Sequence, residues 1–260
     1  MPRRSSLKQQ LLAGRPAIGC WLHTASADAA EILGGGGFDF LLIDHEHGPA
    51  GFTDAVAQIR AAQAGSEGAD GPAMLMRVPW NDKVYLKRAL DCGVSGVMIP
   101  NVESAQAARA AVAACKFPPA GVRSAAGIIR AAGYGADPGY FGTIDEDVLV
   151  ICQIETKAAV EQIAEIGAVP GVDVLFIGPR DLSGSIGKGG RYDDPEVQAL
   201  IARAEAGILK SGRVLGSIAS DAAAASAMLA RGYQMVLPTS DVTLLREGAL
   251  AVMAALRDKL

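Results

Sequence analysis

Two carboxylates stand at the ends of two neighbouring apolar runs, residues 148–154 and 172–177. Glu155 follows the first run directly, and Asp181 lies four residues after the second. The segment between the runs has apolar residues at a helical period, which predicts a strand–helix–strand unit with parallel strands. Ligands of such sheets bind at the carboxyl ends of the strands, so both acids are expected at one rim.

Two carboxylates without a third His or Cys at ligand spacing suit a hard divalent cation such as Mg²⁺ or Mn²⁺. A zinc hydrolase would need more imidazole ligands. Each acid also has a structural alternative. Glu155 is placed to favour a helix dipole, and Asp181 is placed to cap the loop after Gly178 and Pro179. Their occurrence together on successive strands favours the metal site.

A second polar group, DHEH, follows the apolar run 38–43 and contains two of the chain's three histidines. His47 is the best candidate for a general base, because an ordinary imidazole titrates near neutral pH. Asp44, three residues earlier, is placed to orient the His47 ring. His45 is expected to point the opposite way if the strand continues, and His23 is expected to be a wall residue.

Arg77 is a cation inside the apolar strand expected over residues 73–78. A buried arginine needs a partner, which an ion pair with Asp44 or Glu46 would supply. The functional alternative is that Arg77 faces the metal and stabilises an enolate or alkoxide. Gln153 also lies near a strand end, two residues before Glu155. Both interpretations of Arg77 remain open at this point.

Strands and helices are expected to alternate eight times along the chain, which predicts a (β/α)8 TIM barrel in one domain, residues 1–260. A doubly wound open sheet is the alternative, but no GxGxxG motif follows the first strand. A long irregular segment is expected over residues 118–142. The expected strands are 17–22, 38–43, 73–78, 96–100, 148–154, 172–177, 214–217 and 235–237. The expected helices are 7–14, 27–33, 52–64, 82–90, 104–115, 158–166, 195–211, 221–231 and 244–256.

The composition of the chain indicates which classes of partner and which cellular compartment to expect. The 260 residues carry a formal net charge of −4, which gives no reason to expect nucleic acid or a membrane as partner. No signal peptide is recognised, and no apolar run reaches the roughly 18 residues of a membrane span. The four cysteines are far apart and form no CxxC pair, so a cytoplasmic protein with reduced thiols is expected.

Six motifs resemble those of the HpcH/HpaI aldolases, the class II, metal-dependent pyruvate aldolases. They cover nearly the whole chain in family order: LLIDHEHGP at 41–49, RVPWND at 77–82, LDCG at 90–93, PPAGVR at 118–123, QIET at 153–156 and FIGPRDLS at 176–183. The resemblance implies reversible cleavage of a 4-hydroxy-2-oxo acid to pyruvate and an aldehyde. It also implies a barrel whose C-terminal helix is swapped between subunits of a hexamer, a trimer of swapped dimers.

The same resemblance implies roles for individual residues. Glu155 and Asp181 match the metal ligands, for Mg²⁺ or Mn²⁺ and with Co²⁺ or Zn²⁺ as alternatives. Arg77 matches the arginine that stabilises the pyruvate enolate, His47 matches the acid/base, and Asp44 matches the aspartate partner of that histidine. Physically, a divalent cation and Arg77 would both oppose the negative charge of an enolate.

Substrate contacts follow from the resemblance as well. Gln153 and the stretch Gly178, Pro179, Arg180 and Asp181 match groups that hold pyruvate, and Asp91 resembles a residue contributed to the neighbouring subunit's site. The chain departs from the family pattern at His45, Ser124 and Arg180. Arg180 or Arg123 is therefore expected to recognise an acidic or hydroxyl-rich aldehyde tail.

Three other functions are compatible with this fold. The same enolate machinery would also decarboxylate oxaloacetate. A Schiff-base aldolase needs a lysine on a barrel strand, whereas Lys157 is expected at a helix start and the other lysines on helices, loops or termini. A non-catalytic assembly protein of this fold is the remaining alternative, and the presence of the expected rim residues argues against it.

Overall fold

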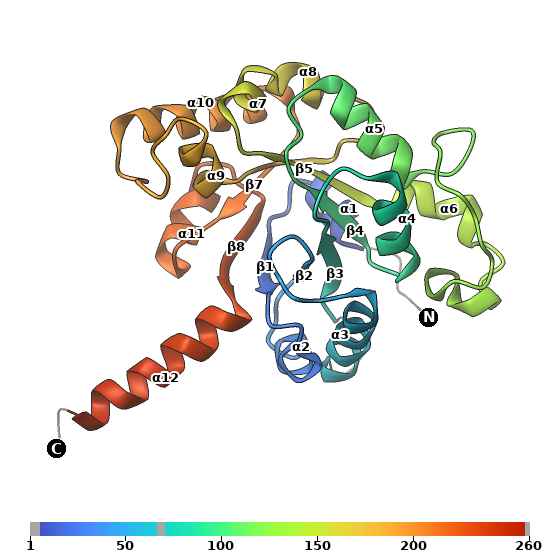
Figure 1. Ribbon diagram of the computed structural model, residues 1–260, viewed down its shortest axis with the longest axis horizontal. Helices are drawn as coiled ribbons and strands as arrows, with labels where there is room; N and C mark the ends of the chain where they lie inside the picture. The colour runs from blue at the N-terminus through green and yellow to red at the C-terminus, as the bar shows by residue number, and fades with distance from the viewer. Residues whose placement is uncertain (1–5, 67–70, 258–260) are drawn as a thin grey trace.

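Eight parallel strands close into a barrel in the computed structural model, which describes residues 6–66 and 71–257 (Figure 1). The first strand, β1 (Ala17–Leu22), pairs with β8 (Met235–Ser240) and closes the sheet. The strands between them are β2 (Phe40–Asp44), β3 (Ala73–Arg77), β4 (Gly96–Ile99), β5 (Leu149–Ile154), β6 (Val174–Ile177) and β7 (Val214–Ile218). The expected TIM barrel is confirmed, and the closed sheet excludes the doubly wound alternative.

Helices alternate with the strands in the order that the sequence pattern predicts. They are α1 (Ser6–Leu12), α2 (Ala27–Gly34), α3 (Phe52–Gly65), α4 (Lys83–Asp91), α5 (Ala105–Cys115), α10 (Pro195–Ser211), α11 (Ala222–Ala230) and α12 (Asp241–Arg257). The helix expected over 158–166 is interrupted at Gln162, giving α7 (Lys157–Glu161) and α8 (Ile163–Gly167). The segment 118–142 is less irregular than expected, because it holds the 3-10 helix η1 (Arg130–Gly135) and the start of α6 (Tyr140–Asp147).

The barrel interior is a packed core. Side chains of one strand parity meet inside, among them Trp21, Phe40, Leu42 and Leu75, while the other parity packs against the helices. Gly19 makes room for a large neighbour, because a Cβ there would lie 2.2 Å from the Phe40 ring. The inward-facing positions at the strand ends carry polar residues instead, and these form the floor of the candidate site.

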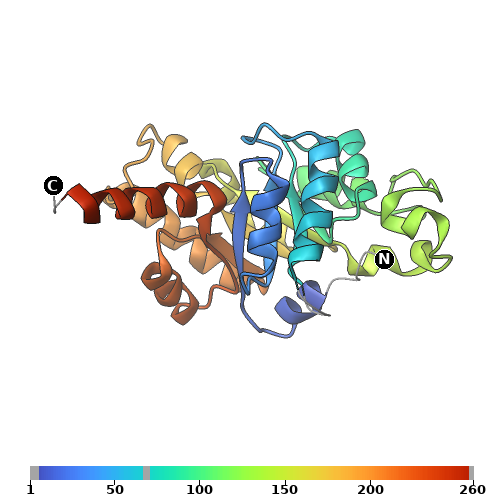
Figure 2. The same ribbon diagram turned by 90° about the horizontal axis from the view of Figure 1, so that it is seen from below.

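The last helix leaves the barrel. Figures 1 and 2 show α12 extending outward from the end of β8 instead of lying along the barrel wall. Asp241 is its one buried residue in the described part of the helix. Large apolar side chains on α12 are exposed: Val242, Leu244, Leu245, Leu250, Val252, Met253 and Leu256. This helix therefore presents an apolar surface that its own chain does not cover.

Two further expectations concern thiols and membranes. Cys20, Cys92, Cys115 and Cys152 are buried and free, as the sequence predicts. Among the described residues, no helix has both the length and the apolarity that a membrane span requires.

Candidate active site

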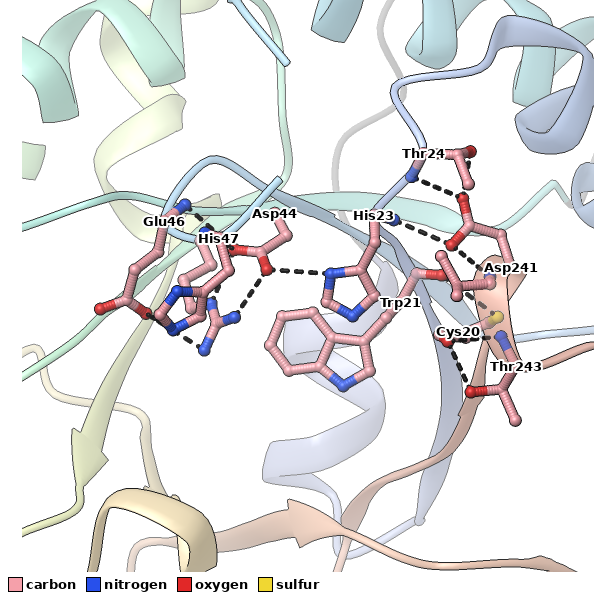
Figure 3. A network of polar contacts seen from close by, with 12 residues as sticks. Cys20, Trp21, His23, Thr24, Asp44, Glu46, His47, Asp241 and Thr243 are labelled. Atoms are coloured by element: carbon pink, nitrogen blue, oxygen red, sulfur yellow. Dashed lines mark hydrogen bonds and ion pairs between the residues drawn. The ribbon is translucent and has the colours of Figure 1, made fainter. Parts of the chain in front are cut away.

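Asp44 is the centre of a charged network at the end of β2. Its carboxylate is fully buried and is held by the guanidinium of Arg77 through two hydrogen bonds, Nε to Oδ1 at 2.9 Å and Nη2 to Oδ2 at 2.7 Å. The backbone N–H groups of Glu46 and His47 also donate to Oδ1, at 3.0 and 3.3 Å. The ring nitrogen Nδ1 of His23 lies 3.0 Å from Oδ2 (Figure 3).

These contacts keep Asp44 ionised. Although burial raises the pKa of this carboxyl, hydrogen bonds from His23 and Arg77 and the charge of Arg77 outweigh it and hold the pKa well below its usual range. A carboxylate that accepts five N–H donors has no lone pair left to take a proton from a substrate. Asp44 is thus suited to fixing its neighbours in place.

Arg77 forms both ion pairs that the sequence left as alternatives. In addition to the contact with Asp44, its Nη1 lies 3.1 Å from Oε2 of Glu46. The guanidinium carbon lies 4.4 Å from the centre of the Trp21 ring, so the cation also rests on an aromatic face. An arginine has five N–H groups. The contacts with Asp44 and Glu46 in the described chain use three of them, which leaves one on each terminal nitrogen.

Glu155 is a buried acid that faces other acids. Its Oε1 accepts the backbone N–H of Asn101 at 2.6 Å, and its Oε2 accepts Nε2 of Gln153 at 3.0 Å. Burial, with smaller contributions from the charges of Glu46 and Asp181, raises the pKa of Glu155 to about 7. A cation beside Glu155 would oppose both effects, because it would stabilise the ionised carboxylate.

Asp181 lies in a short helix that the sequence pattern did not reveal, α9 (Pro179–Gly184). Gly178 is the N-cap of α9, and its backbone N–H donates to Ile154 at the end of β5, which ties the two strand ends together. A Cβ at Gly178 would lie 2.9 Å from Oε2 and 3.0 Å from Cβ of Glu155, so a larger residue there would have to displace the Glu155 side chain. Asp181 and Arg180 are exposed in the first turn of the helix.

The donor set at this rim fits a hard divalent cation that retains several non-protein ligands. In the described part of the chain, no three side chains of His, Cys, Asp or Glu are arranged to hold an ion together. Mg²⁺ is commonly held by one or two carboxylates, with waters and substrate oxygens in the remaining positions. Oε1 of Gln153 is buried without a hydrogen-bond partner in the described chain, which leaves one further oxygen beside Glu155 for a ligand.

His47 does not contact Asp44 in the way the sequence suggested. The imidazole of His47 is 65% exposed, and its Nε2 lies 3.7 Å from Glu46 Oε2. Asp44 contacts the backbone N–H of His47, while the ring that Asp44 contacts is that of His23. The expected orientation of the His47 ring by Asp44 is therefore corrected. The reason is side-chain parity: position 23 continues the inward direction of Trp21, which brings the His23 ring to the Asp44 carboxylate.

His45 points away from the barrel interior, as expected from its parity. Its ring packs against Phe52 of α3 and Tyr85 of α4, and Nδ1 lies 2.9 Å from the Tyr85 hydroxyl. Burial lowers the pKa of His45, so the neutral ring is favoured. His45 thus belongs to the layer between sheet and helices.

Arg123 and Asp91 lie away from this rim. Asp91 ends α4, and a helix that follows a barrel strand ends at the opposite face from the strand's carboxyl end. The fully buried Arg123 donates to Asp91 at 2.8 Å and to the Tyr140 hydroxyl at 3.1 Å, above the Phe117 ring. The Arg123 guanidinium is thus enclosed beside Asp91 at the other end of its own barrel, and its expected contact with an aldehyde stays a prediction.

Comparisons with known proteins identify the family of the chain. The family model described as HpcH/HpaI aldolase/citrate lyase matches residues 17–248. A 2-dehydro-3,6-dideoxy-6-sulfogluconate aldolase from Pseudomonas putida is 41% identical, with 93% of each chain covered. A 4-hydroxy-2-oxo-heptane-1,7-dioate aldolase from Salmonella heidelberg is 40% identical, with 96% of this chain and 94% of that protein covered.

A solved structure supports the same relationship. The structure of a HpcH/HpaI aldolase/citrate lyase family protein from Burkholderia cenocepacia superposes with a TM-score of 0.92 at 36% identity. The match covers 97% of this chain and 99% of that one. The sequence resemblance is thereby confirmed. The chain belongs to the HpcH/HpaI aldolase/citrate lyase family, whose named relatives are aldolases.

Proposed function

We propose that this protein, as one barrel domain, is a divalent-metal-dependent aldolase that reversibly cleaves a 4-hydroxy-2-oxo acid into pyruvate and an aldehyde. The observation that carries the proposal is the buried Glu155 carboxylate, placed beside the charges of Asp181 and Glu46 with its pKa raised to about 7. A buried carboxylate beside other acids is costly to ionise unless a cation compensates its charge. Glu155 and Asp181 would hold that cation, with Mg²⁺ or Mn²⁺ the best fit to the oxygen donors.

The rim residues supply the remaining electrostatics. When bound, the cation acts as a Lewis acid and opposes the negative charge that cleavage leaves on the oxygens of the oxo acid. The guanidinium of Arg77 is fixed by Asp44 and Glu46, and its two remaining N–H groups can donate to a developing enolate oxygen. Donors that are already oriented pay no reorganisation cost when the charge develops.

Proton transfer and substrate orientation involve the other residues. His47 is exposed and beside Glu46, where it would take the proton of the C4 hydroxyl during cleavage and return it during synthesis. Gln153 donates its amide N–H to Glu155 and would thereby orient the Glu155 carboxylate. Its Oε1 has no partner among the described residues and could accept a hydrogen bond from the substrate or a water. The first-turn amides of α9 lack partners within the helix and face the same rim, where they would receive the pyruvate carboxylate.

Chelation and borohydride distinguish this chemistry from a Schiff-base aldolase. None of the eight strands contains a lysine, and Lys157 is exposed at the start of α7. We expect EDTA to reduce pyruvate-forming activity to background, Mg²⁺ or Mn²⁺ to restore it, and borohydride with pyruvate to have no effect. A mass increase after borohydride treatment, or full activity in EDTA, would contradict the proposed class. Oxaloacetate decarboxylation, measured in the same samples, shows whether that reaction exceeds aldol cleavage.

Arg180 is proposed to recognise an anionic aldehyde tail. The names of the two aldolase relatives describe substrates with a sulfonate or a carboxylate at the end remote from C1. Arg180 is exposed beside Asp181, has no ion pair among the described residues, and lies where the helix dipole disfavours a cation. Its presence is therefore not explained by the stability of α9.

Replacing Arg180 with alanine is expected to raise KM for an aldehyde with a carboxylate or sulfonate tail about tenfold or more. This is the size of one charge-assisted hydrogen bond. The effect on a neutral aldehyde of similar length should be less than about twofold. The measurement is the ratio of kcat/KM for the two aldehydes, with Arg180→Lys as the matched variant that keeps the charge. An unchanged ratio in Arg180→Ala would exclude this role.

The exposed apolar side of α12 supports assembly of the chain into an oligomer. A helix that buries one residue and exposes seven large apolar side chains is suited to packing on a second copy of the chain. We infer a swapped dimer within a hexamer, in which Asp91 at the foot of the barrel reaches the neighbouring site. The Asp91 side chain is 25% exposed, so it remains accessible beside Arg123.

Leu245 gives a direct test of this assembly, because its side chain is 74% exposed. We expect Leu245→Glu to shift the protein to a smaller species in light scattering coupled to size-exclusion chromatography. Glu247→Gln, an exposed polar change on the same helix, should leave the mass unchanged. A wild-type monomer would contradict the proposed swap.

The state of the cysteines supports a proposal for the cellular compartment. Four buried, free thiols suit a reducing compartment, and we therefore place the protein in the cytoplasm. Labelling of cell fractions with an antibody against the chain would test this placement.

A further inference from the structure

His23 is held in the site from two sides. Its ring nitrogen Nδ1 lies 3.0 Å from Asp44 Oδ2, and its backbone N–H donates to Asp241 Oδ1 at 2.9 Å (Figure 3). The backbone N–H of Thr24 donates to the same Asp241 carboxylate at 3.0 Å. Because Asp241 is the first residue of α12, the end of β1 is tied both to the base of that helix and to the charged network.

The His23 ring also has a fixed plane. It stacks on Trp21 with the ring centres 5.3 Å apart and an angle of 13° between the planes. Trp21 is the aromatic side chain on which Arg77 rests as well. Thus His23, Asp44, Arg77 and Trp21 form a closed ring of contacts that joins β1, β2 and β3.

The proton position on His23 follows from its partner. Asp44 is a carboxylate, because its pKa is held well below the usual range, so it can only accept. Nδ1 of His23 must therefore carry the hydrogen and donate to Oδ2. Arg77 Nη2 donates to the same oxygen, which makes His23 the second of the two side chains that fix this end of the Asp44 carboxylate.

We propose that His23 is a positioning residue for the enolate chemistry, acting through Asp44 on the orientation of Arg77. The inference rests on the proposed aldolase function and extends it to a residue outside the metal site. Without the His23 donor, Oδ2 keeps only Arg77 among these side chains, and the space beside Trp21 opens. The carboxylate and the guanidinium then gain freedom to turn together, and the two N–H groups of Arg77 are no longer fixed toward the substrate.

Two substitutions separate this role from simple packing. His23→Asn places an amide N–H close to the position of Nδ1, whereas His23→Leu keeps apolar bulk against Trp21 but removes the donor. The readout is exchange of the pyruvate methyl hydrogens with D₂O, followed by NMR with Mg²⁺ present, because this exchange reports enolate formation without any aldehyde. We expect His23→Leu to lower kcat for exchange at least tenfold with a smaller change in KM, and His23→Asn to stay within about threefold of wild type.

A second measurement does not depend on activity. Exchange of the Arg77 Nε–H with solvent, observed by NMR after selective arginine labelling, reports how firmly Asp44 holds the guanidinium. The signal should be protected in wild type and His23→Asn and should exchange faster in His23→Leu. If His23→Leu does not fold, His23→Gln takes its place, because its longer side chain carries the amide beyond the Nδ1 position.

The outcomes distinguish the inference from the function on which it rests. If wild type neither exchanges pyruvate hydrogens nor cleaves a 4-hydroxy-2-oxo acid, the proposed aldolase is wrong, whatever the Arg77 signal shows. If wild type is active and His23→Leu matches it in exchange rate and in Arg77 protection, the positioning role is wrong and the aldolase stands. Equal losses in the Leu and Asn variants would likewise overturn the role, because they would show that the donor is not what matters.

Discussion

Replacing Glu155 with glutamine is expected to lower kcat/KM by about a thousandfold or more, because the site loses one of its two proposed metal carboxylates. The substituted amide can still accept the Asn101 N–H at the position of Oε1, so the local backbone should keep its place. It is neutral, however, and neutral oxygens bind Mg²⁺ far more weakly than carboxylates. Isothermal titration with Mn²⁺ should show the corresponding loss of metal binding.

The same substitution should not destabilise the protein when metal is absent. Burial, together with the charges of Glu46 and Asp181, raises the pKa of Glu155 to about 7, so the ionised acid opposes folding near neutral pH. Removing that charge should leave the melting temperature in EDTA unchanged or higher. Glu161→Gln, a change at an exposed glutamate of α7, is the matched control for activity and metal binding. Normal Mn²⁺ affinity in Glu155→Gln would rule out Glu155 as a ligand.

Replacing Arg77 with leucine is expected to abolish activity and also to destabilise the fold by about 3–5 kcal/mol, the cost of leaving a buried charge without its partner. The uncompensated group is Asp44, whose side chain is fully buried and loses both hydrogen bonds from the guanidinium. Arg77→Lys keeps the charge but cannot form the paired contact with both oxygens. It should retain more stability than Arg77→Leu while still losing most of the enolate formation. Urea denaturation measures the stability, and pyruvate hydrogen exchange measures the chemistry.

Acid denaturation gives Arg77→Leu a second, directional test. A carboxyl whose folded pKa is depressed contributes stability above its unfolded pKa, and this contribution is lost as pH falls toward the folded pKa. In wild type, the pKa of Asp44 is depressed by His23 and Arg77 against the effect of burial. Arg77→Leu removes part of that depression, so its acid-unfolding midpoint should move to higher pH. Arg109→Leu, at an exposed position of α5, should leave both the midpoint and the activity unchanged. An unshifted midpoint in Arg77→Leu would show that Asp44 does not depend on Arg77 for its charge.

The sequence alone determined the fold class and the rim. Eight apolar runs at regular spacing require parallel strands, and the expected strand limits agree with the structure to within two residues, except that β8 runs three residues further. The periodicity of side chains along a strand also determined that His45 faces the helices, as its contact with Tyr85 confirms. These features follow from local patterns of hydrophobicity, which a single chain displays directly.

The sequence pattern did not predict the short helices. The six-residue helix α9 contains Pro and Gly and too few apolar positions to show a period, although it carries Asp181. Gln162 interrupts the helix expected over 158–166, where apolar spacing alone continues without a break. Local patterns identify long amphipathic segments well, but a single helical turn is decided by its packing.

Only the tertiary structure decided which partners the charged groups take. Asp44 was expected to orient His47, but the closed barrel brings the inward-facing His23, directly after β1, to its carboxylate instead. Arg123 pairs with Asp91, because the long connection after α5 encloses both at the opposite end of the barrel, and no local pattern in the sequence predicted this ion pair. Such pairings join residues that are 21 to 33 positions apart, as the contacts of Asp44 with His23 and with Arg77 show. Strand order and shear determine them, because a sequence fixes which face a side chain occupies but not which neighbour it meets there.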